Sequence, residues 1–182
     1  MEDDKVIIWS DQVYQKALEL LEQRGVTLED IGEIVMILQE NYIPDITMDQ
    51  ALESIHAVLN KREVQNALLT GIQLDMLAEE GKLISPLQEM LANDESLYGV
   101  DEVMSLAIVN LYGSIGFTNY GYADKRKYGV LQKLNDKAYG IHTFLDDLVG
   151  AIAAAASSRL AHRYRHRQEE AYRAKMASSE SK

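Results

Sequence analysis

Apolar residues recur at helical spacing along most of this chain. In the first such segment Val13, Ala17, Leu20 and Leu21 are separated by three or four residues, which places them on one face of a helix. Glycine, proline and helix-capping residues stand between successive apolar segments and mark where helices begin and end. The pattern predicts helices over residues 11–24, 28–42, 48–61, 62–80, 86–93, 102–117 and 143–177.

Polar side chains at the predicted boundaries support these helices. Thr27 with Asp30, and Thr47 with Gln50, have the three-residue spacing of a capping box, in which two side chains satisfy exposed backbone N–H groups. Thr143 precedes the last apolar segment and is the expected N-cap of the last helix. No strand pattern of useful length interrupts the series.

We therefore predict an all-α fold: a single-domain bundle of six or seven helices, with a central apolar helix surrounded by the others. The segment that follows a capping Asp101 is apolar nearly all round, as expected for a buried helix. We expect its residues 103–115 to be the central helix, or to share the centre with residues 145–156. Residues 1–158 would form the bundle domain and residues 159–182 a basic helical extension of the last helix.

The composition limits the cellular locations and the binding partners that we expect for this protein. The chain of 182 residues is 47% hydrophobic and contains no cysteine, so disulfides and thiolate metal sites are excluded. Its acidic N-terminus does not resemble a signal peptide and no apolar run is long enough to span a bilayer, so we expect a cytoplasmic location. Residues 1–150 carry 11 basic and 26 acidic side chains, whereas residues 151–182 carry seven basic and three acidic ones. The acidic body should repel nucleic acid, while the basic tail, Arg159 to Lys175, could contact a membrane surface peripherally.

Residues 111–129, "LYGSIGFTNYGYADKRKYG", contain four glycines and four tyrosines and are expected to form a loop. Exposed glycine amides and cations beside a carboxylate, Asp124, suit a metal–phosphate site. A plain turn followed by a solvated charge run explains the same residues, and the glycine spacing does not match a P-loop. The candidate phosphate-binding residues are Thr118, Asn119, Gly121, Lys125 and Arg126.

The adjacent aspartates Asp146 and Asp147 begin the last helix. Negative charge at a helix N-terminus is stabilising without any ligand, so the pair could serve only that purpose. Gly150, however, is the same-face neighbour of both and leaves space beside them for a ligand or another helix. The candidate catalytic and metal-binding residues are Asp124, Asp146 and Asp147, with His142, Gly150 and Asp75 as supporting residues.

Several segments resemble the soluble YutG-like branch of the phosphatidylglycerophosphatase A family. These are "SIGFTNYGYADK", "HTFLDDLVGAIAAAASSRLAHR", "REVQNALLTGIQLDMLAEEG" and "DESLYGVDEV", which together cover most of the chain. The resemblance implies a helical bundle with one central helix. It also links a D-E-x-x-G motif to a Mg²⁺-dependent lipid phosphatase, and Asp146, Asp147 and Gly150 fall on that motif with Asp in place of Glu. Two family features are missing, the membrane-spanning helices and a P-G-T-x-G-S stretch.

Two functions follow as hypotheses. The first is a Mg²⁺-dependent phosphatase of a phosphate monoester, by resemblance phosphatidylglycerophosphate in lipid metabolism. Its ligand would be a phosphate-bearing small molecule or a lipid head group. The second is a non-catalytic helical scaffold or phosphometabolite-binding protein, in which the small residues serve helix packing. We expect a homo-oligomer under both.

Overall fold

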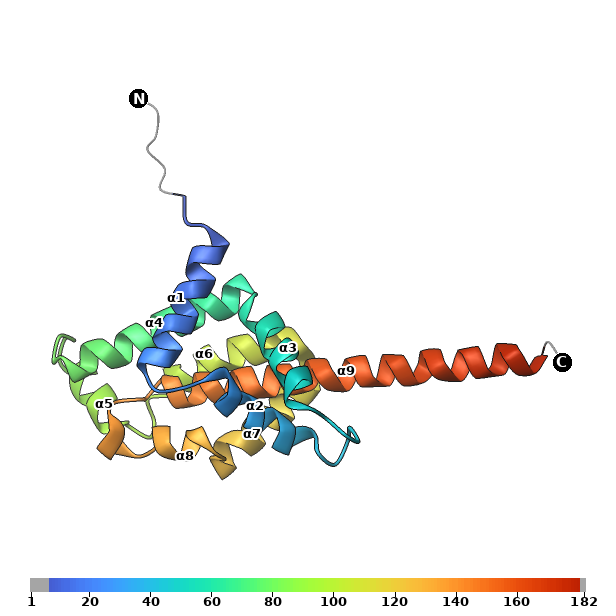
Figure 1. The fold of residues 1–182 in the computed structure, drawn as a ribbon. Coiled ribbons are helices and arrows are strands. Elements are labelled where there is room, and N and C mark those ends of the chain that lie inside the picture. The colour runs from blue at the N-terminus through green and yellow to red at the C-terminus, as the bar shows by residue number, and fades with distance from the viewer. Residues whose placement is uncertain (1–6, 181–182) are drawn as a thin grey trace.

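The computed structural model describes residues 7–180, which form helices joined by short connections (Figure 1). No strand occurs within these residues, and the single helical domain predicted from the sequence is confirmed. The α-helices are α1 Ser10–Gln23, α2 Leu28–Gln39, α3 Met48–Leu59, α4 Arg62–Glu79, α5 Leu87–Asn93, α6 Val100–Val109, α7 Gly113–Arg126, α8 Val130–Leu134 and α9 Leu145–Glu180. Two 3-10 turns, η1 Asn110–Tyr112 and η2 Lys137–Tyr139, complete the described chain.

The first half of α9 is the central helix. Every residue from Leu145 to Ser158 is buried except the half-buried Asp146, and α2, α3, α4, α6, α7 and α8 all pack against this segment. Most side chains from residue 150 to residue 158 are small, so neighbouring backbones approach closely. Ser157 illustrates this closeness, since its hydroxyl accepts hydrogen bonds from Gln39 of α2 at 2.6 Å and Asn119 of α7 at 3.0 Å.

Residues 103–115 do not form the central helix, so of the two expected centres only residues 145–156 lie there. The segment is also not one helix, because Gly113 adopts φ +71°, a left-handed conformation that ends the turn η1 and starts α7. Helix α6 packs against α9 on one face only. On its other face Val103 is 65% exposed and Leu106 is 37% exposed.

The glycine- and tyrosine-rich stretch is helical, which corrects the predicted loop. Helix α7 buries Gly116, Tyr120 and Ala123, which are spaced as i, i+4 and i+7 on one face. Gly116 is required by close packing, because a Cβ there would lie 3.3 Å from the carbonyl oxygen of Val109. The tertiary contact outweighs the low helix propensity of the glycines.

The second half of α9 extends beyond the bundle (Figure 1). Leu160 is still buried and Tyr164 still packs against the core, but every residue from Arg165 to Ser179 is exposed. The expected extension over residues 159–182 is thus continuous with the central helix rather than separated from it. Residues 1–6 and 181–182, which the two predicted units include, lie outside the described residues. Among those described, no helix is long and apolar enough to cross a membrane.

The crossing of α4 and α9 generates the first prediction. At Gly71 of α4 an added Cβ would lie 2.9 Å from the Cβ of Phe144 and 2.5 Å from Cδ1 of Leu148. Gly71→Ala should therefore lower the free energy of unfolding by about 1–3 kcal/mol, despite the better helix propensity of alanine. Urea denaturation followed by circular dichroism measures this loss.

Gly121→Ala is the matched control, because a Cβ at Gly121 would meet no atom within 4 Å. This variant should be as stable as the wild type or more stable by up to about 1 kcal/mol. Equal stability of the two variants would contradict the close approach of α4 to α9.

Candidate metal site

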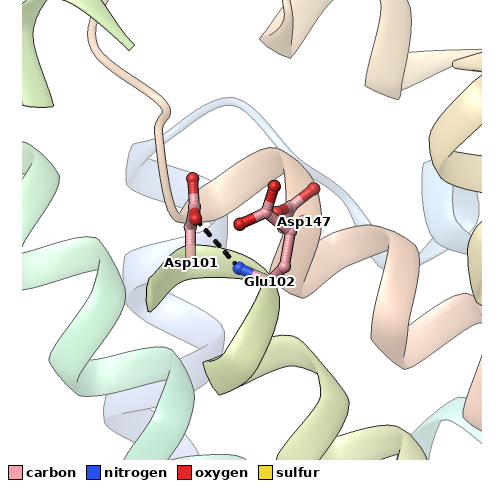
Figure 2. Close-up of side chains that lie close together, drawn as sticks. All are labelled: Asp101, Glu102 and Asp147. Carbon is pink, nitrogen blue, oxygen red and sulfur yellow. Dashed lines mark hydrogen bonds between the residues drawn. The ribbon is translucent and has the colours of Figure 1, made fainter. Parts of the chain in front are cut away.

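Three carboxylates from two helices meet where α6 packs against α9. Asp101 and Glu102 lie in the first turn of α6, and Asp147 lies in the first turn of α9. One oxygen from each comes within 4.8 Å of the others. Figure 2 shows the Asp101 and Glu102 side chains on the side of α6 that faces Asp147. Asp101 and Asp147 are buried and Glu102 is exposed, so the cluster opens to solvent at Glu102.

The carboxylates of this cluster carry more negative charge than the nearby positive groups balance. Burial, with the nearby Asp146 carboxylate, raises the pKa of Asp147 to about 8, although Lys127 acts in the opposite direction. Burial and the Glu102 carboxyl raise the pKa of Asp101 to about 7. Ionised carboxylates this close repel one another, and a divalent cation on the same oxygens would remove the repulsion. Oxygen ligands of this kind are those that Mg²⁺ prefers.

Lys127 supplies positive charge on the other side of Asp147. Its Nζ lies 2.7 Å from Asp124 Oδ1, 2.7 Å from Asp146 Oδ2 and 3.7 Å from Asp147 Oδ1. Lys127 ends α7 with φ +49°, and this left-handed turn accompanies the return of its side chain toward α9. Burial lowers the pKa of Lys127, but the carboxylates of Asp146 and Asp124 together outweigh burial and raise it. The ammonium group therefore stays charged.

The structure brings the three predicted aspartates together. Asp124, Asp146 and Asp147 all surround the Lys127 ammonium group, and of the three only Asp147 also belongs to the cluster with Asp101 and Glu102. Lys127 thus occupies the position between Asp124 and Asp146 that the sequence had suggested for a metal ion. Whether these aspartates act in catalysis remains a prediction.

The candidate phosphate-binding residues of α7 lie apart from the aspartates. Thr118 is exposed and donates to the carbonyl of Ser114, as expected within a helix. Asn119 donates to Ser157, which lies 11 residues after Asp146 on α9, or about 16 Å along the helix axis. Gly121, Lys125 and Arg126 are exposed, and Arg126 stacks over Tyr122 at 5.8 Å. Because the segment is helical, most of its backbone N–H groups are already bonded.

Gly150 makes room for a ring rather than leaving an open space. An added Cβ at Gly150 would lie 3.7 Å from the Tyr120 ring, which reaches α9 from α7. Tyr120 therefore lies against the helix one turn beyond Asp147. The sequence predicted space at position 150 for a ligand or another helix, and in the structure this tyrosine lies beside that position.

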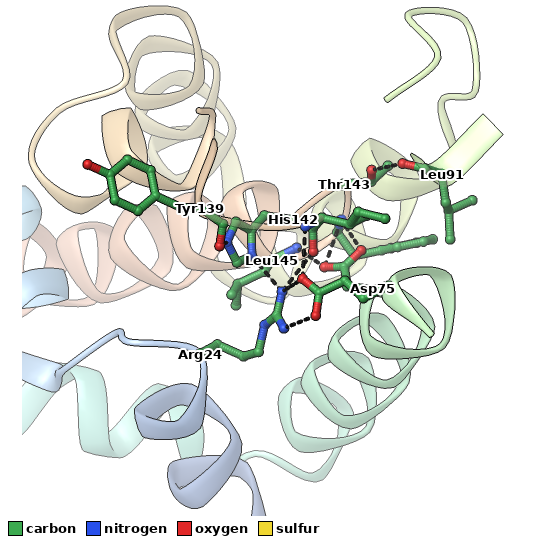
Figure 3. Close-up of polar contacts among 10 residues, drawn as sticks. Arg24, Asp75, Leu91, Tyr139, His142, Thr143 and Leu145 are labelled. Carbon is green, nitrogen blue, oxygen red and sulfur yellow. Dashed lines mark hydrogen bonds and ion pairs between the residues drawn. The ribbon is translucent and has the colours of Figure 1, made fainter. Parts of the chain in front are cut away.

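Asp75 caps the buried N-terminus of α9, a role that the sequence had assigned to Thr143. Its carboxylate accepts the N–H groups of Phe144 at 3.1 Å and Leu145 at 3.0 Å, while Thr143 donates to the carbonyl of Leu91 (Figure 3). Burial raises the pKa of Asp75 to about 8, although both N–H groups oppose this. Asp75 thus fixes where α9 begins, and with it the position of Asp146 and Asp147.

Arg24 joins three chain segments beside this cap. It binds Glu79 through two hydrogen bonds of 2.7 Å, donates to the carbonyl of Ile141 at 2.9 Å and contacts His142 Nδ1 at 3.0 Å. Because arginine cannot accept a hydrogen bond, Nδ1 must be unprotonated and the Nε2–H group faces the carbonyl of Tyr139. His142 is therefore a neutral structural residue that orients the segment before α9.

A cleft of about 280 Å³ opens on the other side of Asp146. Three carboxylates, those of Glu79, Asp94 and Asp146, line it together with Lys137, whose ammonium group donates to the carbonyl of Asn93. This lining does not favour a phosphate. Lys127 is the cation better placed to bind one, since its Nζ lies 3.7 Å from Asp147 of the carboxylate cluster.

Sequence reasoning missed Asp101, Glu102 and Lys127. Asp101 was read only as a helix cap, and Lys127 was passed over for the two cations before it. A signal for the acidic pair was present, because Asp101 and Glu102 match the D-E of the D-E-x-x-G motif, with Ser105 at the position of its glycine. Their pairing with Asp147 depends on a contact between residues 45 positions apart.

His142 generates a prediction about pH. Burial, and next the Arg24 guanidinium, lower the pKa of His142 below its usual 6.5. As the pH falls, this histidine is protonated in the unfolded chain at a higher pH than in the folded chain. The stabilisation from neutral His142 is therefore complete above pH 6.5 and is lost as the pH falls below it. The stability difference between wild type and His142→Gln, measured by urea denaturation at pH 7.5, 6.5 and 5.5, should shrink on acidification. A difference that stays constant or grows would contradict the neutral state.

Comparison with known proteins places this geometry in context. The chain is 63% identical over 156 residues to the uncharacterized protein YutG of Bacillus subtilis, covering 85% of this chain and 94% of YutG. A solved protein of unknown function from Bacillus stearothermophilus is 64% identical with a TM-score of 0.81, covering 82% of this chain and 94% of that one. The low temperature requirement C protein of Listeria monocytogenes is 58% identical with a TM-score of 0.82, covering 84% and 97% of the two chains.

These relatives share the helical fold over nearly their whole length. Residues 18–162 match the family described as phosphatidylglycerophosphatase A, and this range contains the three carboxylates, Lys127 and the Asp75 cap. The family match therefore covers both the bundle and the candidate site, and the chain belongs to the phosphatidylglycerophosphatase A family.

Proposed function

We propose that this protein is a Mg²⁺-dependent phosphatase that hydrolyses a phosphate monoester. The observation that carries the proposal is the cluster of Asp101, Glu102 and Asp147 beside the charged Lys127. The family name supports the reaction class. The names of the relatives assign them no activity, so the reaction rests on this geometry and on the family.

The residues fit a Mg²⁺ ion and a phosphate side by side. Asp101, Glu102 and Asp147 would hold the ion, whose chemistry is to polarise a phosphoryl oxygen and to lower the pKa of a bound water. Lys127 would bind the phosphate oxygens as a point charge. Asp124 and Asp146 hold the Lys127 ammonium group in place, and the backbone N–H of Asp147 donates to Asp146 at 2.9 Å.

The proposed substrate is phosphatidylglycerophosphate, whose terminal phosphate is a monoester. Two features support a lipid. The apolar side chains of Val100 and Val103 are exposed on either side of the acidic pair, at 47% and 65%. The exposed basic residues of α9 could hold the protein on an anionic surface. A lipid and a soluble phosphate ester are therefore assayed side by side.

Asp147→Asn tests the activity. Phosphate release from phosphatidylglycerophosphate vesicles and from glycerol 3-phosphate is measured with Mg²⁺ and with EDTA. The variant should lose more than about 100-fold in rate, above the 10–100-fold typical of a residue that only supports a metal ligand. It should fold normally, since neutralising Asp147 removes repulsion within the cluster.

Asp49→Asn is the matched control, since Asp49 is an exposed aspartate in the first turn of α3. Its activity should equal that of the wild type. Full activity of Asp147→Asn, or activity that survives EDTA, would refute the metal-dependent site. If the wild type hydrolyses no phosphate monoester, the non-catalytic scaffold becomes the better explanation.

The basic end of α9 provides a second test, of the lipid surface. Arg173 and Lys175 are both exposed. Reversing both to glutamate should weaken sedimentation with vesicles containing anionic lipid by at least about tenfold, since each basic residue near a surface contributes about 1 kcal/mol. Lys16→Glu combined with Lys82→Glu, at two exposed residues outside α9, changes the net charge by the same amount and is the control. Equal sedimentation of the double variant and the control would exclude this helix as the membrane contact.

A further inference from the structure

Two buried hydroxyl groups lie behind the acidic cluster and have no partner. Tyr120 is 6% exposed and Ser105 is fully buried. Within residues 7–180 neither Tyr120 OH nor Ser105 Oγ makes a hydrogen bond. A buried hydroxyl without a partner is costly and uncommon, so two beside one site call for an explanation.

Each hydroxyl lies one helical turn from an acidic residue of its own helix. Ser105 follows Asp101 by four residues on α6, and Tyr120 precedes Asp124 by four residues on α7. Residues four apart share a helix face, so each hydroxyl belongs to the face that carries an acidic group. On α9, Gly150 lies three residues after Asp147, and a Cβ added there would lie 3.7 Å from the Tyr120 ring.

The acidic groups near Tyr120 are Asp124 and members of the cluster. After burial, the groups that raise its pKa are Asp147 and Asp124, with a smaller effect from Glu102. The Ser105 hydroxyl lies close enough to lower this pKa slightly, but the two hydroxyls do not meet the geometry of a hydrogen bond. The phenol therefore keeps its proton, and its buried hydroxyl has a hydrogen bond to donate.

We propose that the Tyr120 hydroxyl donates a hydrogen bond to an oxygen atom bound to the divalent cation of the Asp101–Glu102–Asp147 cluster. The proposal rests on the proposed function, because it requires that cation. The oxygen belongs either to a water molecule or to the phosphate. Tyr120 is a positioning residue, and Ser105 supports its hydroxyl from α6.

Tyr120→Phe removes the hydroxyl and keeps the ring that packs against Gly150. The probe is Mn²⁺, whose binding to the full chain is measured by electron paramagnetic resonance with and without inorganic phosphate. If the oxygen belongs to water, the variant should bind Mn²⁺ about tenfold more weakly without phosphate, the loss expected for one hydrogen bond. If it belongs to phosphate, the loss should appear only when phosphate is present.

The melting temperature of the metal-free variant separates this role from a structural one. Removing an unpartnered buried hydroxyl should leave the melting temperature unchanged or raise it, whereas loss of a structural bond would lower it. Tyr122→Phe is the matched control, because its hydroxyl pairs with Tyr128 at 2.9 Å outside the cluster. This control should bind Mn²⁺ and phosphate as the wild type does.

The outcomes distinguish this inference from the proposed function. If the wild type binds Mn²⁺ and Tyr120→Phe binds Mn²⁺ and phosphate equally well, the role of Tyr120 is overturned and the proposed metal site is not. Absence of Mn²⁺ binding by the wild type would overturn both. If Ser105→Ala also binds Mn²⁺ or phosphate more weakly than the wild type, the result would support the roles assigned to both Tyr120 and Ser105.

Discussion

The buried first half of α9 is the constraint on which the rest of the structure depends. Its small side chains let α2, α3, α6 and α7 approach its backbone closely, and its N-terminus lies inside the protein. A buried helix N-terminus needs partners for its N–H groups. Asp75 supplies them from α4, and Arg24 with Glu79 holds the preceding segment. The start of α9 is therefore fixed in three dimensions, and Asp146 and Asp147 are fixed with it.

Electrostatics then distinguishes two sides of Asp147. On one side Lys127 neutralises Asp124 and Asp146 through contacts of 2.7 Å. On the other side Asp101 and Glu102 have no comparable cation within the described residues, and the pKa values of Asp101 and Asp147 rise to about 7 and about 8. Buried carboxyl groups with pKa values raised in this way are typical of functional sites. The asymmetry suggests a divalent cation on one side and a phosphate near Lys127.

The sequence was a good guide to local structure and a poor one to long-range contacts. Apolar periodicity located most helices, and the capping boxes at Thr27 and Thr47 are present as predicted. The glycines of α7 indicated a loop because their propensity is low, yet the segment is helical and Gly116 packs closely against Val109 at the end of α6. Asp101 looked like a cap because its partner Asp147 lies on another helix. The inward turn of Lys127 depends on a left-handed backbone conformation that no local sequence pattern predicted.

The central claim is that Asp101, Glu102 and Asp147 bind one divalent cation beside Lys127. Anomalous diffraction from crystals grown with Mn²⁺ tests it most directly, because the ion can be located independently of the protein atoms. We predict a single strong peak in contact with oxygens of all three carboxylates, with Lys127 still next to Asp147. A peak between Asp124 and Asp146 in place of the Lys127 ammonium group, or no peak near Asp147 at saturating Mn²⁺, would contradict the account.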